Sequence, residues 1–92
     1  MKLSQIDDFV DSVASGESII VPEGLEEAFI GLDSESSPPR GVFSIEKCIA
    51  ILSEDMTKKE AEDFFWFNVA GGSGDGSPLY INTPTEDISP YE

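Results

Sequence analysis

Apolar positions near the start of the chain recur with the spacing of an amphipathic helix. They are separated by three and four residues, which places them on one side of a helix. These positions are Ile6, Phe9, Val10 and Val13. Three aspartates fall on the opposite side and should face solvent: Asp7, Asp8 and Asp11. We expect the helix to begin at Ser4, whose hydroxyl can accept an amide hydrogen bond, and to end at Gly16.

Short runs of β-branched and aromatic residues predict strands between the helices. The three candidate strands are Ser18–Val21, Glu27–Leu32 and Pro78–Ile81. Pro22 ends the first of them, and Gly31 could mark a bulge in the second.

Two further helices are predicted in the middle of the chain. The first begins after Ser44, which can cap it, and ends near Glu54. Its apolar stripe consists of Ile45, Cys48, Ile49 and Leu52. The second begins with the capping box Thr57–Glu60, whose two side chains can satisfy amides of the first turn, and it should run from Lys58 to Ala70.

Aromatic residues crowd the end of this last helix. A regular α-helix would place one apolar face at Ala61, Phe64, Phe65 and Asn68. Asn68 would then bind a buried backbone group. Trp66 falls on the other side, near Glu62 and Lys59, and a large aromatic side chain outside the core stripe is a candidate binding anchor. The alternative is that Trp66 covers a neighbouring strand or the N-terminal helix.

These elements predict one α+β domain, with about three helices packed on one face of a small sheet of two to four strands. We place the compact domain at residues 1–83 and a loose tail at residues 84–92, where prolines alternate with polar residues. A chain of 92 residues has room for one modest core and little room for a deep cleft.

The charge balance favours a basic protein partner over nucleic acid or membrane. Nineteen acidic residues against five basic ones give a net charge of −14. Phosphate backbones and anionic lipids are bound chiefly by Lys and Arg, so direct contact with either is disfavoured. Strong negative charge steers association with a basic surface. The same acidity could also serve solubility alone.

Candidate chemistry is sparse in this sequence. The chain has one cysteine and no histidine, so Cys48 lacks a base and fits a core position, and no internal disulfide can form. The glycine-rich run Gly71–Ser77 follows a helix and lacks the Lys of a phosphate loop. Arg40 suits a carboxylate such as Asp33 or Glu35. We therefore expect no enzyme, no cofactor and no metal site.

The N-terminal residues include acids where a signal peptide needs an apolar segment, so we expect a cytoplasmic protein. No apolar run approaches the length of a membrane span.

The segment from Ala28 to about Pro84 resembles a family of small uncharacterised proteins of bacteriophages and bacteria. The matching motifs are FIGL at 29–32, the segment from Pro39 to Phe43, EKCIAIL at 46–52, EAEDFFWFNVAG at 60–71 and the strand after Pro78. The resemblance implies a phage or prophage origin and an α+β fold, and it supplies no activity or catalytic residue. Trp66 and the glycine-rich run after Ala70 depart from the family pattern.

The leading hypothesis is a non-enzymatic, phage-type accessory protein that binds and occludes a host protein in the bacterial cytoplasm. The partner would have a basic surface and could bind nucleic acid, with the acids standing in for phosphates. The residues expected to bind it are Trp66, Glu62, Asp63, Asp7, Asp8 and Asp11. The alternative is a structural, self-assembling homodimer that uses Trp66 and an exposed strand edge. A small-ligand carrier would need a pocket that the sequence does not disclose.

Overall fold

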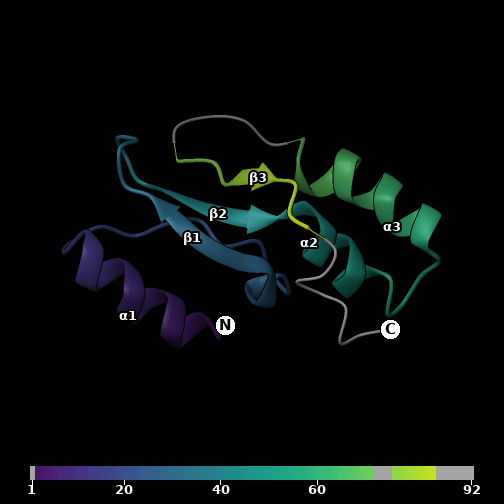
Figure 1. The fold of residues 1–92 in the computed structure, drawn as a ribbon, viewed down its shortest axis with the longest axis horizontal. Coiled ribbons are helices and arrows are strands. Elements are labelled where there is room, and N and C mark those ends of the chain that lie inside the picture. The colour runs from purple at the N-terminus through teal and green to yellow at the C-terminus, as the bar shows by residue number, and fades with distance from the viewer. Residues whose placement is uncertain (1, 72–75, 85–92) are drawn as a thin grey trace.

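The chain folds as an α+β domain, as the sequence predicts. A computed structural model describes residues 2–71 and 76–84, and within them three α-helices surround a three-stranded mixed sheet (Figure 1). In chain order the elements are α1 (Leu3–Val13), η1 (Glu26–Ala28), β1 (Phe29–Asp33), β2 (Arg40–Ser44), α2 (Ile45–Leu52), α3 (Lys58–Phe64), η2 (Phe65–Val69) and β3 (Leu79–Ile81).

The sheet has the order β1-β2-β3. Strands β1 and β2 form an antiparallel hairpin, and β3 joins the other side of β2 in the parallel direction. The register of the hairpin shifts between Phe29 and Gly31, so the irregularity suggested by Gly31 is present. The expected strand from Glu27 begins later, because Glu26–Ala28 form a 3₁₀ turn.

The predicted strand Ser18–Val21 is wrong. These residues pair with no strand among the residues described, and the segment instead crosses one face of the sheet. A Cβ atom added to Gly41 in β2 would lie 2.9 Å from Cδ1 of Ile19. Since a Cβ atom projects from the face of a sheet, Ile19 must lie over that face and not beside its edge. The absent side chain at Gly41 makes room for it.

Hydrogen bonds at the helix ends confirm two of the three expected caps. The hydroxyl of Ser44 accepts a hydrogen bond from the backbone N–H of Lys47 at 3.1 Å. Thr57 and Glu60 form the full capping box, with distances of 2.9 and 3.2 Å. The cap at Ser4 is wrong.

Helix α1 begins one residue before Ser4. The N–H of Lys2 donates to the Gln5 side chain at 2.8 Å, and this bond takes the place of the one expected from Ser4. The helix ends at Val13, and Gly16 follows with a φ of +85°, a left-handed conformation that glycine adopts without strain.

The core is centred on a chain of aromatic rings in contact with one another. Phe43 in β2 packs edge-on against Phe29, with ring centroids 5.6 Å apart, and lies 6.0 Å from Tyr80 of β3. Tyr80 in turn meets Phe65 at 5.2 Å. The buried apolar residues are Ile6, Val10, Leu25, Ala28, Phe29, Phe43, Ile45, Cys48, Ala61 and Phe65. Helix α1 thus buries only Ile6 and Val10 of its predicted stripe, since Phe9 is 36% exposed and Val13 is 49% exposed.

Helix α1 and helix α3 lie on opposite sides of the fold (Figure 1). Helix α1 runs beside β1, whereas α3 lies on the far side, beyond β3 and α2. Among the residues described, no helix has the length and apolar character needed to cross a membrane.

Candidate interaction surface

The helix that carries Trp66 changes its winding before it ends. Helix α3 stops at Phe64 and continues as the π-helix η2, in which the N–H of Ala70 donates to the carbonyl oxygen of Phe65 at 2.8 Å. A π-turn spans one residue more than an α-turn and rotates the following side chains relative to the α-helical register. The expected continuous helix to Ala70 is therefore interrupted, and its predicted apolar face is divided.

Burial shows how the predicted face divides. Ala61 and Phe65 are fully buried, whereas Phe64 is 41% exposed. Asn68 is exposed as well, so the expectation that it binds a buried backbone group is wrong. π-Turns recur at functional sites in proteins, so the side chains that this turn exposes to solvent are candidates for a binding site.

Three exposed aromatic side chains flank the buried Phe65 in the sequence. They are Phe64, Trp66 and Phe67, which we call the aromatic ridge. Trp66 is 53% exposed and Phe67 is 82% exposed. The indole of Trp66 meets the ring of Phe65 edge-on at 4.9 Å, so it rests on the core but does not enter it. It does not cover α1, which lies on the other side of the fold (Figure 1).

The acidic residues expected to bind a partner fall into two separate groups. On α3, Asp63 is exposed and Glu62 is partly buried, directly before the aromatic ridge. On α1, all three aspartates are exposed: Asp7, Asp8 and Asp11. Because α1 and α3 lie on opposite sides of the fold, the structure does not join these groups into one surface (Figure 1).

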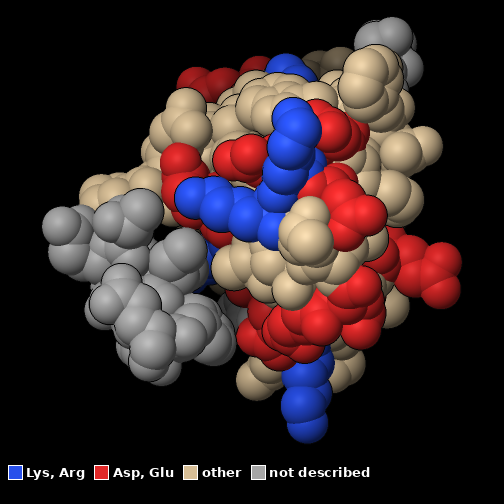
Figure 2. All heavy atoms as spheres, turned by 90° about the vertical axis from the view of Figure 1, so that its right-hand side faces the viewer, with Lys and Arg blue, Asp and Glu red and all other residues tan. Residues whose placement is uncertain are grey.

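Carboxylates crowd the end of the molecule on which α3 begins. Figure 2 shows Asp and Glu side chains covering much of this end, with a few Lys and Arg side chains lying among them. This face is acidic, but it is not of a single sign. A partner would therefore meet a mixed pattern of charge here.

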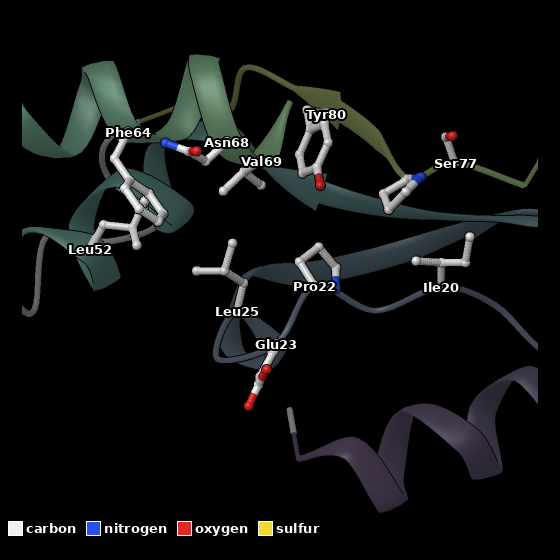
Figure 3. Close-up of a pocket in the computed structure, with 11 residues that line it drawn as sticks. Ile20, Pro22, Glu23, Leu25, Leu52, Phe64, Asn68, Val69, Ser77 and Tyr80 are labelled. Atoms are coloured by element: carbon white, nitrogen blue, oxygen red, sulfur yellow. The ribbon is translucent and has the colours of Figure 1, made fainter. Parts of the chain in front are cut away.

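A half-open apolar groove of about 450 Å³ runs beside the aromatic ridge. One wall comes from the segment that crosses the sheet, and the other comes from α3, η2 and β3 (Figure 3). Its lining residues are Ile20, Pro22, Glu23, Leu25, Leu52, Phe64, Asn68, Val69, Ser77, Pro78 and Tyr80. In Figure 3 the hydroxyl of Tyr80 points into the groove, toward Pro22. Desolvation by burial, followed by the nearby Cys48, raises the pKa of Tyr80 to about 12, so the phenol stays protonated.

The groove could not be foreseen from the sequence. Ile20 and Tyr80 come from opposite ends of the chain, and the groove exists only because the segment that contains Ile20 lies across the sheet. The weak sequence signal is that Phe64 and Asn68 are four residues apart, which places both on one side of a helix.

Cys48 is fully buried in α2, as expected for a core residue. Burial raises the pKa of its thiol to about 12, which makes it a poor nucleophile at neutral pH.

Arg40 connects strand β2 to the segment that precedes β3. Its Nε donates to the carbonyl oxygen of Ser77 at 2.8 Å. The predicted partner Asp33 lies opposite Arg40 in the hairpin register. The pKa of Asp33 is lowered mainly by a hydrogen bond from the Ser36 side chain, with the charge of Arg40 as a smaller cause. Arg40 thus ties β2 to the segment before β3, which the sequence did not indicate.

Glu46, in the first turn of α2, holds the residues that follow β3. One carboxylate oxygen accepts the N–H of Thr83 at 2.7 Å, and the other accepts the side-chain amide of Asn82 at 2.8 Å. The hydroxyls of Ser44 and Thr83 lie 2.6 Å apart. Desolvation disfavours the charged form of Glu46, but these hydrogen bonds outweigh it and lower the pKa of the carboxyl group. The predicted tail from residue 84 lies beyond this anchor and, after Pro84, outside the described residues.

Within the described ranges, no three Asp, Glu, Cys or His side chains come together as a metal site would require. Most of the glycine-rich run, residues 72–75, lies outside these ranges. The features that remain as a candidate site are the aromatic ridge, the neighbouring groove and the carboxylates of α3. No protein-family model, curated protein or solved structure matches the chain.

Proposed function

We propose that this chain is a non-enzymatic binding protein that attaches to the basic surface of another protein and occludes it. The observation that carries the proposal is the aromatic ridge, with Trp66 53% and Phe67 82% exposed, directly after the carboxylates of Glu62 and Asp63. A folded protein of this size has little reason to expose adjacent large aromatic side chains unless a partner covers them. Trp is moreover enriched among the residues that dominate binding energy.

The two kinds of residue would contribute to different steps of binding. The net charge of −14 accelerates encounter with a basic surface, and this effect weakens as salt is added. The aromatic ridge then removes apolar area from water when the surfaces meet, which slows dissociation. Carboxylates at the margin of the interface would fix the relative position of the two proteins and add specificity.

The resemblance to phage and prophage proteins suggests the class of protein to which the partner belongs. We propose a host protein that itself binds nucleic acid, because its phosphate-binding groove would be basic and would accept carboxylates in place of phosphates. Inhibition of a defence or regulatory protein would follow from simple occlusion of that groove.

A second candidate is a homodimer without a host target. It is favoured by the outer edge of β1, which no strand pairs within the described part of the sheet, and by Ile30, which is 39% exposed there. Mass measurement by light scattering at high concentration tests it directly. A monomer at all concentrations would exclude this candidate, whereas a dimer that Trp66→Ala dissolves would replace the first proposal.

Affinity capture from a bacterial lysate tests the leading proposal. The immobilised protein should retain a basic protein that is lost in Trp66→Ala and in Phe67→Ala. The matched control is Val13→Ala, which removes an apolar side chain of similar exposure from α1 and should retain the partner. Urea unfolding of each variant shows whether a loss of binding reflects a loss of folding.

Charge variants then examine the electrostatic part. The double change Glu62→Gln with Asp63→Asn should release the partner at lower salt than the unmodified protein does. The double change Glu17→Gln with Glu35→Gln, at exposed acids outside both groups, removes the same number of charges and is the control for net charge. Retention that is independent of salt and of the ridge variants would overturn the proposal.

A further inference from the structure

The groove beside the aromatic ridge is built to exclude charge from its interior. Most of its lining side chains are apolar, among which Leu25 is nearly fully buried and Ile20 is 54% exposed, and Asn68 and Ser77 are uncharged polar members of the lining. Glu23 is the one ionisable side chain of the lining apart from the tyrosine, and its carboxylate is turned away from the hollow (Figure 3). The interior thus suits an apolar group, and the only charge in the lining is the carboxylate of Glu23.

The form of the groove favours a side chain that remains attached to a larger partner. Its volume of about 450 Å³ exceeds that of any single side chain, and it is open to solvent along one side. An apolar side chain could enter while the backbone of its own protein stays outside. The hydroxyl of Tyr80, which points into the space, can donate a hydrogen bond to a carbonyl group of that backbone (Figure 3).

The groove and the aromatic ridge meet at Phe64, whereas Trp66 and Phe67 do not line the groove. Phe64 lines the groove and is also a member of the ridge. No Lys or Arg side chain lines the groove, and the whole chain carries a charge of −14. An occupant that approaches this surface must therefore tolerate or complement negative charge.

We propose that the groove holds one large apolar side chain of a basic protein segment, with Lys or Arg residues on either side of it. This inference rests on the proposed function, since the occupant is a part of the same basic partner. It adds that recognition requires a lysine- or arginine-rich stretch with an apolar residue within it, and that charge alone does not suffice.

A pair of synthetic peptides tests the inference without knowledge of the partner. The first is a short lysine-rich peptide with one central phenylalanine, and the second has serine at that position. Burial of the phenylalanine should make the first peptide bind about tenfold more tightly, or better. Amide resonances of the ¹⁵N-labelled protein near Val69 and Tyr80 should shift with the phenylalanine peptide and not with the serine peptide.

Variants that fill the groove supply the matched comparison. Asn68→Trp and Ile20→Trp enlarge exposed side chains that line the groove, so both proteins should fold. Each should weaken the phenylalanine peptide to the level of the serine peptide, a loss of about tenfold. Val13→Trp adds the same group at a similarly exposed position on α1 and should leave the preference for phenylalanine intact.

The outcomes separate this inference from the proposed function. Equal binding of both peptides, with shifts confined to acidic positions, would overturn the groove inference and leave the electrostatic proposal standing. A preference for phenylalanine that survives in both groove-filling variants would also overturn it. If neither peptide binds at low salt and no basic protein is captured from the lysate, the proposed function fails together with the inference.

Discussion

Four consecutive aromatic residues provide a direct test of which side chains are buried in the helix that carries the site. We expect single replacements of Phe64, Phe65, Trp66 and Phe67 by alanine to reduce stability by clearly different amounts. The predicted apolar face contains both Phe64 and Phe65, and equal burial of the two rings would make the two replacements cost about the same. In the structure only Phe65 is fully buried.

The magnitudes follow from the exposure of each side chain. Phe65 is 0% exposed, and loss of a buried phenylalanine costs about 3–5 kcal/mol. Phe64 and Trp66 are 41% and 53% exposed, so alanine there should cost about 1–3 kcal/mol. Phe67 is 82% exposed, and its replacement should cost less than about 1 kcal/mol. A chain of this length has about 5–14 kcal/mol in total, so Phe65→Ala would unfold easily.

Urea unfolding followed by far-ultraviolet circular dichroism measures these differences. Trp66 is the only tryptophan, so fluorescence would not compare all four variants on equal terms. If Phe65→Ala does not fold, Phe65→Leu should still be less stable than Phe67→Ala. Equal losses for Phe64→Ala and Phe65→Ala would refute the difference in burial between the two rings, and a loss above about 2 kcal/mol for Phe67→Ala would refute its placement in solvent.

Three further changes examine other parts of the fold. Gly41→Val should cost about 1–3 kcal/mol in urea unfolding, because its Cβ atom would approach Ile19 and Phe43 to 2.9 Å, whereas Gly31→Ala meets nothing within 4 Å and should cost much less. Glu46→Gln should lower stability at pH 7, and this loss should shrink as the pH falls below about 4.5, since a carboxyl group whose pKa lies below its usual 4.5 stabilises the fold above that pH and loses its contribution on acidification. Cys48 should react with a thiol reagent at pH 8 only at the rate of unfolding.

Local hydrogen-bond chemistry explains why several features could be predicted from the sequence. The caps at Ser44 and Thr57 depend on residues within one turn, so the sequence contains the whole interaction. The irregularity at Gly31 likewise follows from a property of glycine in strands. The core position of Cys48 follows from the helical period.

Features that depend on distant contacts were not predictable in the same way. Residues Ser18–Val21 have the composition of a strand, but they are extended over the face of the sheet, and propensity does not distinguish the two arrangements. Phe65 is the side chain of this helix that meets Tyr80 in the core. Asn68 lies in the same π-turn, and its side chain is in solvent. The angle of Trp66 on the helix left open whether the side chain is an anchor in solvent or a cover for a neighbouring element, and in the structure it is 53% exposed.

The separation of the two acidic groups has a consequence for how they would act on one partner. A standard interface covers about 800 Å² of each protein, which is a minor part of the 5870 Å² accessible here. An interface centred on the aromatic ridge would include the acids of α3 and exclude those of α1. The aspartates of α1 would then act only through long-range attraction.

This division predicts different kinetic effects for the two groups. Neutralising Asp7 and Asp8 should slow association and leave dissociation unchanged, because exposed charges outside the contact act during encounter. Neutralising Glu62 and Asp63 should also speed dissociation. Surface plasmon resonance with the captured partner at two salt concentrations separates the two rates. Faster dissociation on loss of the α1 aspartates would place the interface on that side of the fold and remove the aromatic ridge from its centre.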